Sequence, residues 1–537
     1  MGSIGLSSAA FALAGVVSAL AYFIWRMYEE RRFYSDVPKP PHHWFWGHLK
    51  LMGEIMAELP PDVHHQSVIT TMAKKYNLPG VFYLDLWPAS PGQVIVIDPD
   101  VAQYMTVTKN YPKHEAEQWF LDPLIGKGNI VTVEGSQWKY LHKMLSPAFS
   151  VQHISNMRPA IAEEIMEFRS MIDKLADTGE KFCLEQLTQR TTFDVIGKAT
   201  FGHSLKAKSQ GSAALEHWEG MCRAFAKTHE SYNFVSNLFK LRTVETEAKK
   251  LDAILAEMIK KRFDIVVQEK TDLTGKKGLS IMDLVLRDFV EESRQVGREV
   301  LDPAFLKNAI TQIKTLLAAG SGTTSNTICY SMMMLSVHPK VVQKLREEHD
   351  AVFTKGVDAT YKMLQNDPYR LNQLEYTTNV IKEVLRLYPI GNTARAGHPT
   401  EKFLAFQGQN YSTEGKMVLP VHMTMHMNDE IFQNATKFDP DRFAREDFPR
   451  NAWRPFERGP RGCLGSPLAM DELKIALLLT IRDFDFTCAD LKPNKTPRVG
   501  WTDWDLTFGD RAFQTFVFEA RPRDGMPMTV KRSNWAS

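Results

Sequence analysis

The chain has 537 residues, of which 44% are hydrophobic and 24% charged, so it can bury a large core and lacks the composition of a disordered protein. A formal net charge of only +2 gives no overall basic field, and we expect no nucleic acid partner. The five cysteines are scattered, odd in number and never spaced as C-x-x-C, which argues against a disulfide framework or a zinc site and favours a reducing compartment.

The first predicted element is a membrane-spanning helix at about residues 4–25. The segment contains no charged residue, and twenty-two residues at helical rise can cross a hydrocarbon core of about 30 Å. Arginines follow it and no basic residue precedes it, so the positive-inside rule places the rest of the chain in the cytosol. A cleaved signal peptide is the alternative, because Ala19-Leu20-Ala21 imitates a cleavage site. The continuing apolar run and the absence of a basic residue ahead of it favour an uncleaved anchor.

We divide the chain into three parts. Residues 1–25 form the anchor, residues 26–45 a basic and proline-rich linker, and residues 46–537 one large domain. Three prolines at 38, 40 and 41 cannot lie inside a helix and make a stiff elbow, although an ordinary linker would predict the same boundary near residue 45.

The large domain is predicted to be mainly α, with small β-sheets at one side. Apolar residues recur with helical spacing over 153–176, 247–270 and 304–320, and Pro339 marks the first turn of a helix over 338–353. Strand candidates are few: residues 93–98, residues 416–423 and the C-terminal stretch 513–532.

The stretch PFERGPRGCLG, residues 455–465, carries the strongest chemical signal. Its glycines and prolines exclude an ordinary helix or strand, and an apolar helical run follows directly. Cys463 should lie just before that helix, where free N–H groups and the helix dipole lower a thiol pKa and favour the metal-binding thiolate. A small buried cysteine, the alternative, does not explain the spacing of Phe456, Gly459, Arg461 and Gly465 around it.

The stretch AAGSGTTS, residues 318–325, breaks the rules of the helix that contains it. Gly320 and Gly322 each cost about 1 kcal/mol relative to alanine, and the hydroxyl side chains compete for backbone hydrogen bonds. Thr323 can bond the carbonyl of Ala319, four residues back, and so open the helix for a small ligand. A helix thinned for close packing is the alternative.

A third motif pairs Glu383 with Arg386 on one helix face. Alone, such a pair is usually a surface ion pair worth under ~1 kcal/mol. Arg442, in FDPDRF, would turn it into a buried triad in which planar guanidinium groups hold one carboxylate. We interpret this triad as structural.

The motifs and their order resemble those of the cytochrome P450 family. The resemblance covers nearly the whole chain. The anchor and the proline elbow are similar to those of microsomal members. The resemblance implies the P450 fold, haem b as cofactor and Cys463 as the thiolate ligand of the haem iron. Phe456, Gly459, Arg461 and Gly465 would complete the haem loop. The resemblance assigns further roles to four groups: Ala319, Gly320, Thr323 and Thr324 at a dioxygen and proton-delivery site; Trp138 and Arg395 at the haem propionates; His142 or Lys143 in a weaker version of that contact; and the Glu383–Arg386–Arg442 triad in holding the cysteine loop.

Two departures from the family pattern matter. The family usually has an acid immediately before the threonine, where this chain has Gly322. Proton delivery would then run through Thr323, Thr324, ordered water or a substrate group. The family's Trp-bearing helix normally offers an arginine where this chain has His142. For Arg395, an ordinary surface arginine is the alternative to a propionate contact.

The resemblance also implies partners. These are O2, a lipophilic small-molecule substrate, membrane lipid of the endoplasmic reticulum, and an NADPH-dependent flavin-containing reductase. No G-x-G-x-x-G opens a βαβ unit, so electrons should come from outside the chain. The reductase would dock on residues 441–462, which hold six arginines against four acids. The C-terminal tail is similar to that of fungal members acting in secondary metabolism.

Pocket walls are expected around residues 119–124, 225–239, 316–317, 390–393 and 513–516, which are mostly apolar. Two rival functions stay open. One is a haem-thiolate isomerase or peroxygenase that needs no reductase, which the missing acid at Gly322 slightly favours. The other is a non-catalytic, membrane-tethered haem-binding protein, which leaves AAGSGTTS without a purpose.

Overall fold

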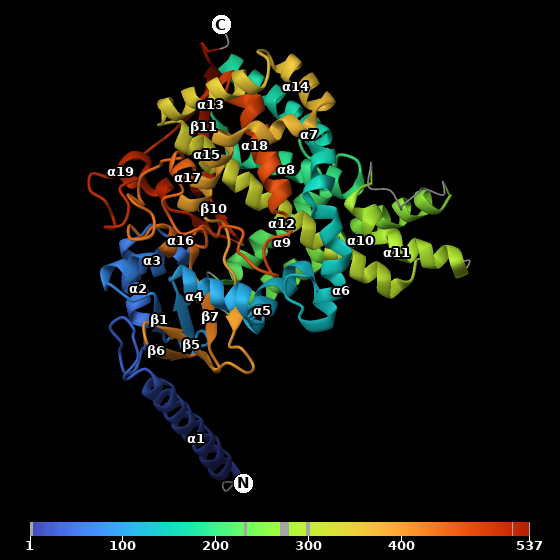
Figure 1. The fold of residues 1–537 in the computed structure, drawn as a ribbon. Helices are drawn as coiled ribbons and strands as arrows, with labels where there is room; N and C mark the ends of the chain where they lie inside the picture. The colour runs from blue at the N-terminus through green and yellow to red at the C-terminus, as the bar shows by residue number, and fades with distance from the viewer. Residues whose placement is uncertain (1–3, 230–233, 269–278, 297–300, 518, 536–537) are drawn as a thin grey trace.

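A computed structural model describes residues 4–229, 234–268, 279–296, 301–517 and 519–535, and among them the chain is mainly helical with small sheets (Figure 1). The α-helices are α1 Ile4–Phe33, α2 Leu49–Glu58, α3 His65–Lys75, α4 Pro99–Gln103, α5 Glu115–Ile125, α6 Gly135–Leu145, α7 Val151–Thr178, α8 Leu184–Phe201, α9 Ala213–His229, α10 Phe234–Gln268, α11 Ile281–Val296, α12 Pro303–Leu335, α13 Pro339–Val352, α14 Val357–Asn366, α15 Glu375–Leu387, α16 His422–His426, α17 Arg442–Arg445, α18 Ser466–Thr480 and α19 Asp505–Phe508. Short 3-10 or π-helical turns are η1 Tyr104–Thr108, η2 Ser146–Phe149, η3 Pro368–Gln373, η4 Gly509–Ala512 and η5 Arg523–Gly525.

The strands form small sheets at the periphery of the helical body. They are β1 Val81–Leu84, β2 Gln93–Val96, β3 Phe182–Cys183, β4 Arg395–Ala396, β5 Phe403–Phe406, β6 Gln409–Ser412, β7 Met417–Pro420, β8 Phe484–Cys488, β9 Thr515–Phe516, β10 Ala520–Arg521 and β11 Pro527–Arg532. The largest sheet has the order β1-β2-β7-β4, in which β2 and β7 run parallel with Gln93 opposite Met417. The expected mainly α fold is confirmed, and β2, β7 and β11 lie in the predicted strand segments.

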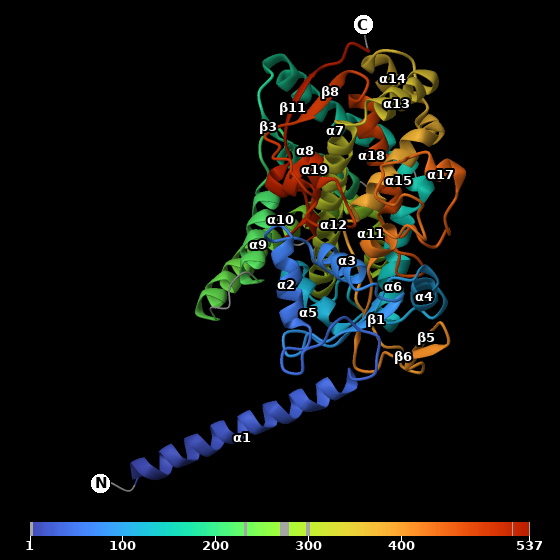
Figure 2. The same cartoon turned by 90° about the vertical axis from the view of Figure 1, so that its left-hand side faces the viewer.

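Helix α12 runs through the middle of the body in both views (Figures 1 and 2). Its 33 residues span about 50 Å, and most of its side chains are buried. It begins with Asp302, whose side chain accepts hydrogen bonds from Ala304 N and Phe305 N, and with Pro303 in the first turn. The helix continues without a break through the AAGSGTTS stretch, because burial against its neighbours outweighs the low helix propensity of that stretch.

Helix α1 projects away from the body (Figure 2). It is the one helix among the described residues that is long and apolar enough to cross a membrane, and its apolar side chains, such as Phe11 and Leu20, are exposed. The helix ends at Phe33, beyond the apolar run, because charged residues such as Arg26 and Glu30 at i, i+4 are good helix formers.

The junction between α1 and the body is hydrogen-bonded. Arg31 forms an ion pair with buried Asp85 and donates to the carbonyl oxygens of Phe45 (3.0 Å) and Trp87 (2.9 Å). The segment expected to be a linker from residue 26 therefore begins as a continuation of helix α1. Side-chain contacts with the body, as well as the prolines, hold the junction in place.

Candidate active site

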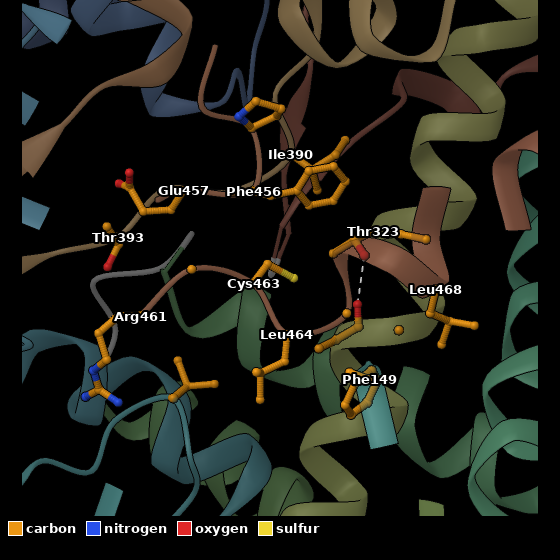
Figure 3. Close-up of a pocket in the computed structure, with 18 of the residues that line it drawn as sticks. Phe149, Thr323, Ile390, Thr393, Phe456, Glu457, Arg461, Cys463, Leu464 and Leu468 are labelled. Carbon is orange, nitrogen blue, oxygen red and sulfur yellow. Dashed lines mark hydrogen bonds between the residues drawn. The ribbon is translucent and has the colours of Figure 1, made fainter. Parts of the chain in front are cut away.

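A cavity of about 360 Å³ lies between the cysteine loop and the centre of α12 (Figure 3). Most of its lining is apolar, from side chains such as Phe149, Ile390 and Leu468. Most of the predicted site residues line it: Trp138, His142, Ala319, Gly320, Thr323, Thr324, Phe456, Arg461, Cys463 and Gly465. The structure thus brings segments more than 300 residues apart to one space.

The cysteine loop has the special backbone path that its composition predicts. Cys463 N donates to Phe456 O (2.9 Å) and Gly462 N donates to Gly459 O (3.0 Å), which curls the chain around the sulfur. Gly459 has φ +84°, and a Cβ there would overlap the carbonyl oxygen of Thr106. Only glycine fits this position without displacing the backbone of η1.

The Cys463 side chain is open to the cavity, directly before α18, and its sulfur points into the space facing α12 (Figure 3). Surrounding protein raises the pKa of this thiol above its ordinary value by desolvation, and the amides of Gly465 and Ser466 only partly oppose the rise. The amides at the helix start lower the pKa, as the sequence predicts, but desolvation is the larger effect in the chain alone.

Glu383, Arg386 and Arg442 form a fully buried cluster. Glu383 accepts from Arg386 Nε (2.8 Å) and from Arg442 Nε (3.0 Å), and the remaining guanidinium nitrogens donate to backbone carbonyls such as Lys437 O. Burial at 0% exposure for all three side chains makes the cluster costly to break on one side.

A histidine connects this cluster to the cysteine loop. His426 Nδ1 lies 3.0 Å from Arg386 O, and its Nε2 accepts from Arg454 N (3.2 Å). Burial and the nearby His422 and Arg386 hold the pKa of His426 well below its usual value, so the ring is neutral and donates at Nδ1. Arg454 in turn binds Glu457 (2.8 Å), inside the loop. The contacts support the structural role predicted for the triad.

On α12, Thr323 Oγ1 donates to Ala319 O (2.7 Å), as the spacing predicts (Figure 3). The helix remains regular there, so the hydroxyl does not open it. Gly320 lines the cavity, and a Cβ on it would lie 2.8 Å from Ile196 Cγ1 of α8. Gly320 therefore allows α12 to pack closely against α8, which was the alternative for this stretch, and it also lines the cavity.

Basic side chains lie at one side of the cavity: Lys113 and Arg461 line it and pair with Glu117 and Glu134, and Arg395 lies outside the lining next to Lys113. Arg395 is fully buried and donates from Nη1 to Tyr111 O (2.7 Å), while its Nε and Nη2 have no hydrogen-bond partner among the described residues. Arg461 stacks over Trp138, whose ring centroid lies 4.9 Å from that of His142. Two buried, unsatisfied donors beside a cavity indicate an anionic ligand group.

Lys113 belongs to this group, although no local sequence pattern points to it. It lines the cavity, pairs with Arg395 in a β-bridge and donates from Nζ to Thr393 Oγ1 (2.6 Å). Desolvation lowers the pKa of Lys113. Only the fold brings residue 113 beside residue 395, so no local pattern could have found it.

Comparison with known proteins decides the family. Residues 37–504 match the family model described as cytochrome P450. The chain belongs to the cytochrome P450 family.

Relatives extend over the whole chain. Cytochrome P450 monooxygenase polC of Polytolypa hystricis is 32% identical over 545 residues, covering 98% of this chain and 96% of that protein. Cytochrome P450 monooxygenase ptmG of Penicillium ochrochloron is 30% identical and covers 96% of this chain and 94% of its own. A solved mutant cytochrome P450DA heme domain has the same fold, with a TM-score of 0.72 at 19% identity over 93% of this chain and 98% of that one. The protein is a P450 monooxygenase.

Family membership implies a haem-thiolate centre, and the residues present fit one. The cysteine sulfur faces the cavity, the lining is largely apolar, and the unsatisfied Arg395 nitrogens with Lys113 offer donors for the two carboxylates of haem b. His142 lies in the same lining, in the place where the family pattern has an arginine.

Two sequence interpretations need correction. Of the expected pocket walls, Leu316 and residues 390–393 line the cavity, and Leu317 does not. Residues 119–124, residues 513–516 and the described parts of 225–239 also lie outside the lining. Residues 230–233 lie outside the described part of the chain. Instead Phe120 packs on Phe225 (ring centroids 5.4 Å) and on Phe516 (5.9 Å) beyond the lining.

The arginine-rich segment 441–462 is also less basic at the surface than its composition suggests. Arg442 and Arg454 are buried, and the Arg461 side chain is 3% exposed and bound to Glu134. The exposed Arg445 pairs with Asp439 and Asp447, and the exposed Arg450 pairs with Glu446, all nearby in the sequence. Half of the six arginines therefore hold the site together and do not face a partner.

Proposed function

We propose that this P450 monooxygenase transfers one oxygen atom of O2 to a lipophilic small molecule, in the secondary metabolism of a fungus. The observation that carries the proposal is the juxtaposition of the Cys463 sulfur and the Thr323 hydroxyl across a largely apolar cavity. An apolar cavity favours lipophilic ligands. The likeness to P450 monooxygenases of Penicillium and Polytolypa supports a fungal pathway.

In this proposal the Cys463 thiolate would bind the haem iron, and Phe456, Gly459 and Gly465 shape its loop. Haem, when bound, supplies the activation of dioxygen and the oxidation of the substrate. The guanidinium of Arg395 would bind a propionate, and the ammonium of Lys113, which is paired with Glu117, would add a donor on the same side. Arg461, Trp138 and His142 complete that side, and Arg461 is already oriented by Val133 O (2.5 Å).

On the opposite side, Thr323 holds a proton at Oγ1, which donates to Ala319 O. Because that acceptor is a backbone carbonyl of an intact helix, the hydroxyl can turn towards a ligand in the cavity at the cost of one hydrogen bond, about 1 kcal/mol. Thr324 and Gly320 shape the adjacent wall.

Electrons come from an NADPH-dependent flavin-containing reductase, and α1 anchors the protein in the membrane of the endoplasmic reticulum with the body in the cytosol. The positive-inside arrangement supports this orientation. The reductase would dock on the cysteine-loop side, where Arg450 and Arg458 are at least partly exposed.

The test is product formation in membranes that contain the full chain and a reductase, with lipophilic substrates screened under ¹⁸O2. We expect NADPH-dependent product that carries one ¹⁸O atom, and none from Cys463→Ala. Product formed from hydrogen peroxide alone, with no response to NADPH, would favour the peroxygenase. A product without ¹⁸O would favour the isomerase, and a haem-loaded chain that consumes nothing would favour the non-catalytic protein.

A further inference from the structure

The acid that is missing from α12 has a counterpart elsewhere in the chain. A Cβ built on Gly322 would overlap Oε1 of Glu519 and lie 2.7 Å from its carboxyl carbon. An acidic side chain at position 322 would place its first carbon beyond Cβ about 1.5 Å away. The Glu519 carboxyl group therefore occupies the space that an acid on α12 would fill.

This placement is built by several contacts along one face of α12. Asn326, one turn after Gly322, donates from Nδ2 to Glu519 Oε1 (3.1 Å) and to Ala520 O (3.1 Å). Tyr330, one turn further, donates to Arg521 O (3.0 Å). Positions 322, 326 and 330 lie four apart, so this face receives residues 519–521 in register. The side chain of Glu519 is 7% exposed.

We propose that Glu519, contributed by the C-terminal hairpin, replaces the acid that α12 lacks and passes protons towards the Thr323 side of the helix. This inference rests on the proposed function. Because Oε1 accepts from Asn326, the transferable proton is carried on Oε2. Glu519 gives the proton on Oε2 to a water molecule, which carries it to the Thr323 side of α12 where the reduction of dioxygen consumes it, and the carboxylate takes up a new proton from solvent; no electron moves through Glu519. It acts through α12 and its neighbours, so it is a positioning residue.

Charged groups connect Glu519 with the protein surface. Arg521 Nε lies 3.7 Å from Glu519 Oε1, and Arg521 Nη1 lies 3.7 Å from Glu185 Oε1 on α8. Both of these side chains are partly exposed, at 17% and 16%. The groups that face this carboxyl region are Arg521 of the hairpin, Glu185 of α8, Asn326 of α12, and Glu219 and Cys222 of α9.

The protonation of Glu519 suits a proton carrier. Desolvation raises its pKa, Arg521 opposes the rise, and the balance is a pKa of about 7. Groups that carry protons work best when their pKa lies near the working pH.

The test uses the full-length holoenzyme in three forms: Glu519→Gln, Gly322→Asp, and Gly322→Asp combined with Glu519→Ala. Glu519→Gln keeps an acceptor for Asn326, so we expect a melting temperature within about 4 °C of wild type. Product per NADPH should fall at least about tenfold, and its pH dependence around pH 7 should disappear. Glu414→Gln, in an exposed ion pair, is the matched control and should behave as wild type.

The exchange variants supply a readout that does not need turnover. Gly322→Asp alone should lower the melting temperature because its side chain overlaps Glu519, and the combined variant should restore both the melting temperature and the coupling of NADPH to product. A Glu519→Gln enzyme that couples like wild type would overturn the proposal, and so would a combined variant that recovers stability without coupling. A wild-type enzyme that forms no NADPH-dependent product would instead sink the proposed function, while the melting temperatures would still report the shared space.

Discussion

The two walls of the cavity are built in different ways. The cysteine wall comes from one contiguous stretch, residues 455–465, whose turns, glycines and helix start are all local. On the opposite wall α12 lacks an acid, and the carboxyl group of Glu519, 197 positions after Gly322, packs against the helix outside the cavity lining. A function encoded in a contiguous motif can be read from sequence, whereas one supplied across the fold needs the structure.

The largest effect should come from breaking the support of the cysteine wall. Glu383→Gln leaves two buried guanidinium groups without a charged partner, and we expect a loss of about 3–5 kcal/mol in the free energy of unfolding. Chemical denaturation with haem absorbance as a second probe would measure it. Glu446→Gln, in the exposed pair with Arg450, is the control and should leave unfolding unchanged. Equal effects of the two variants would show that the buried triad has no special weight.

A smaller loss is expected from Gly459→Ala in the same wall. The left-handed backbone at φ +84° costs about 1–3 kcal/mol for a residue with a Cβ, and the overlap with Thr106 O adds to it. Thermal unfolding and haem content would both fall. Gly500→Ala is the matched control, because a Cβ there meets nothing within 4 Å. If the two alanine variants were equally stable, the cysteine loop would not need the backbone path described.

The carboxyl group of Glu519 beside α12 should make the stability of the protein depend on pH. Glu519 has a pKa of about 7 in the folded chain against an ordinary 4.5, so the folded state binds its proton more tightly than the unfolded state. This contribution to stability is complete below pH 4.5 and is lost as the pH rises to about 7, a change of about 3 kcal/mol. Denaturation at pH 5 and pH 8 should show a smaller difference for Glu519→Gln than for wild type. An unchanged difference would mean that Glu519 is ionised at both pH values.

Much of this molecule could be predicted from its sequence. The helices at α7, α10, α12 and α13 have clear periodicity, and the family motifs lead to Cys463 and Thr323. Lys113 and Glu519 could not be found, because long-range pairing with residue 395 brings Lys113 to the cavity and a hydrogen bond from Asn326 holds Glu519 against α12. The arginines of 441–462 were misjudged because composition does not tell which side chains are buried in ion pairs.

The most direct test of the central claim is the carbon monoxide difference spectrum of the dithionite-reduced, membrane-expressed full chain, recorded for wild type and Cys463→Ser. We expect a strongly red-shifted Soret band for wild type, which reports a thiolate on the haem iron, and its loss in the variant. A wild-type band at the ordinary haem position, or a red-shifted band that survives the substitution, would contradict the assignment of Cys463.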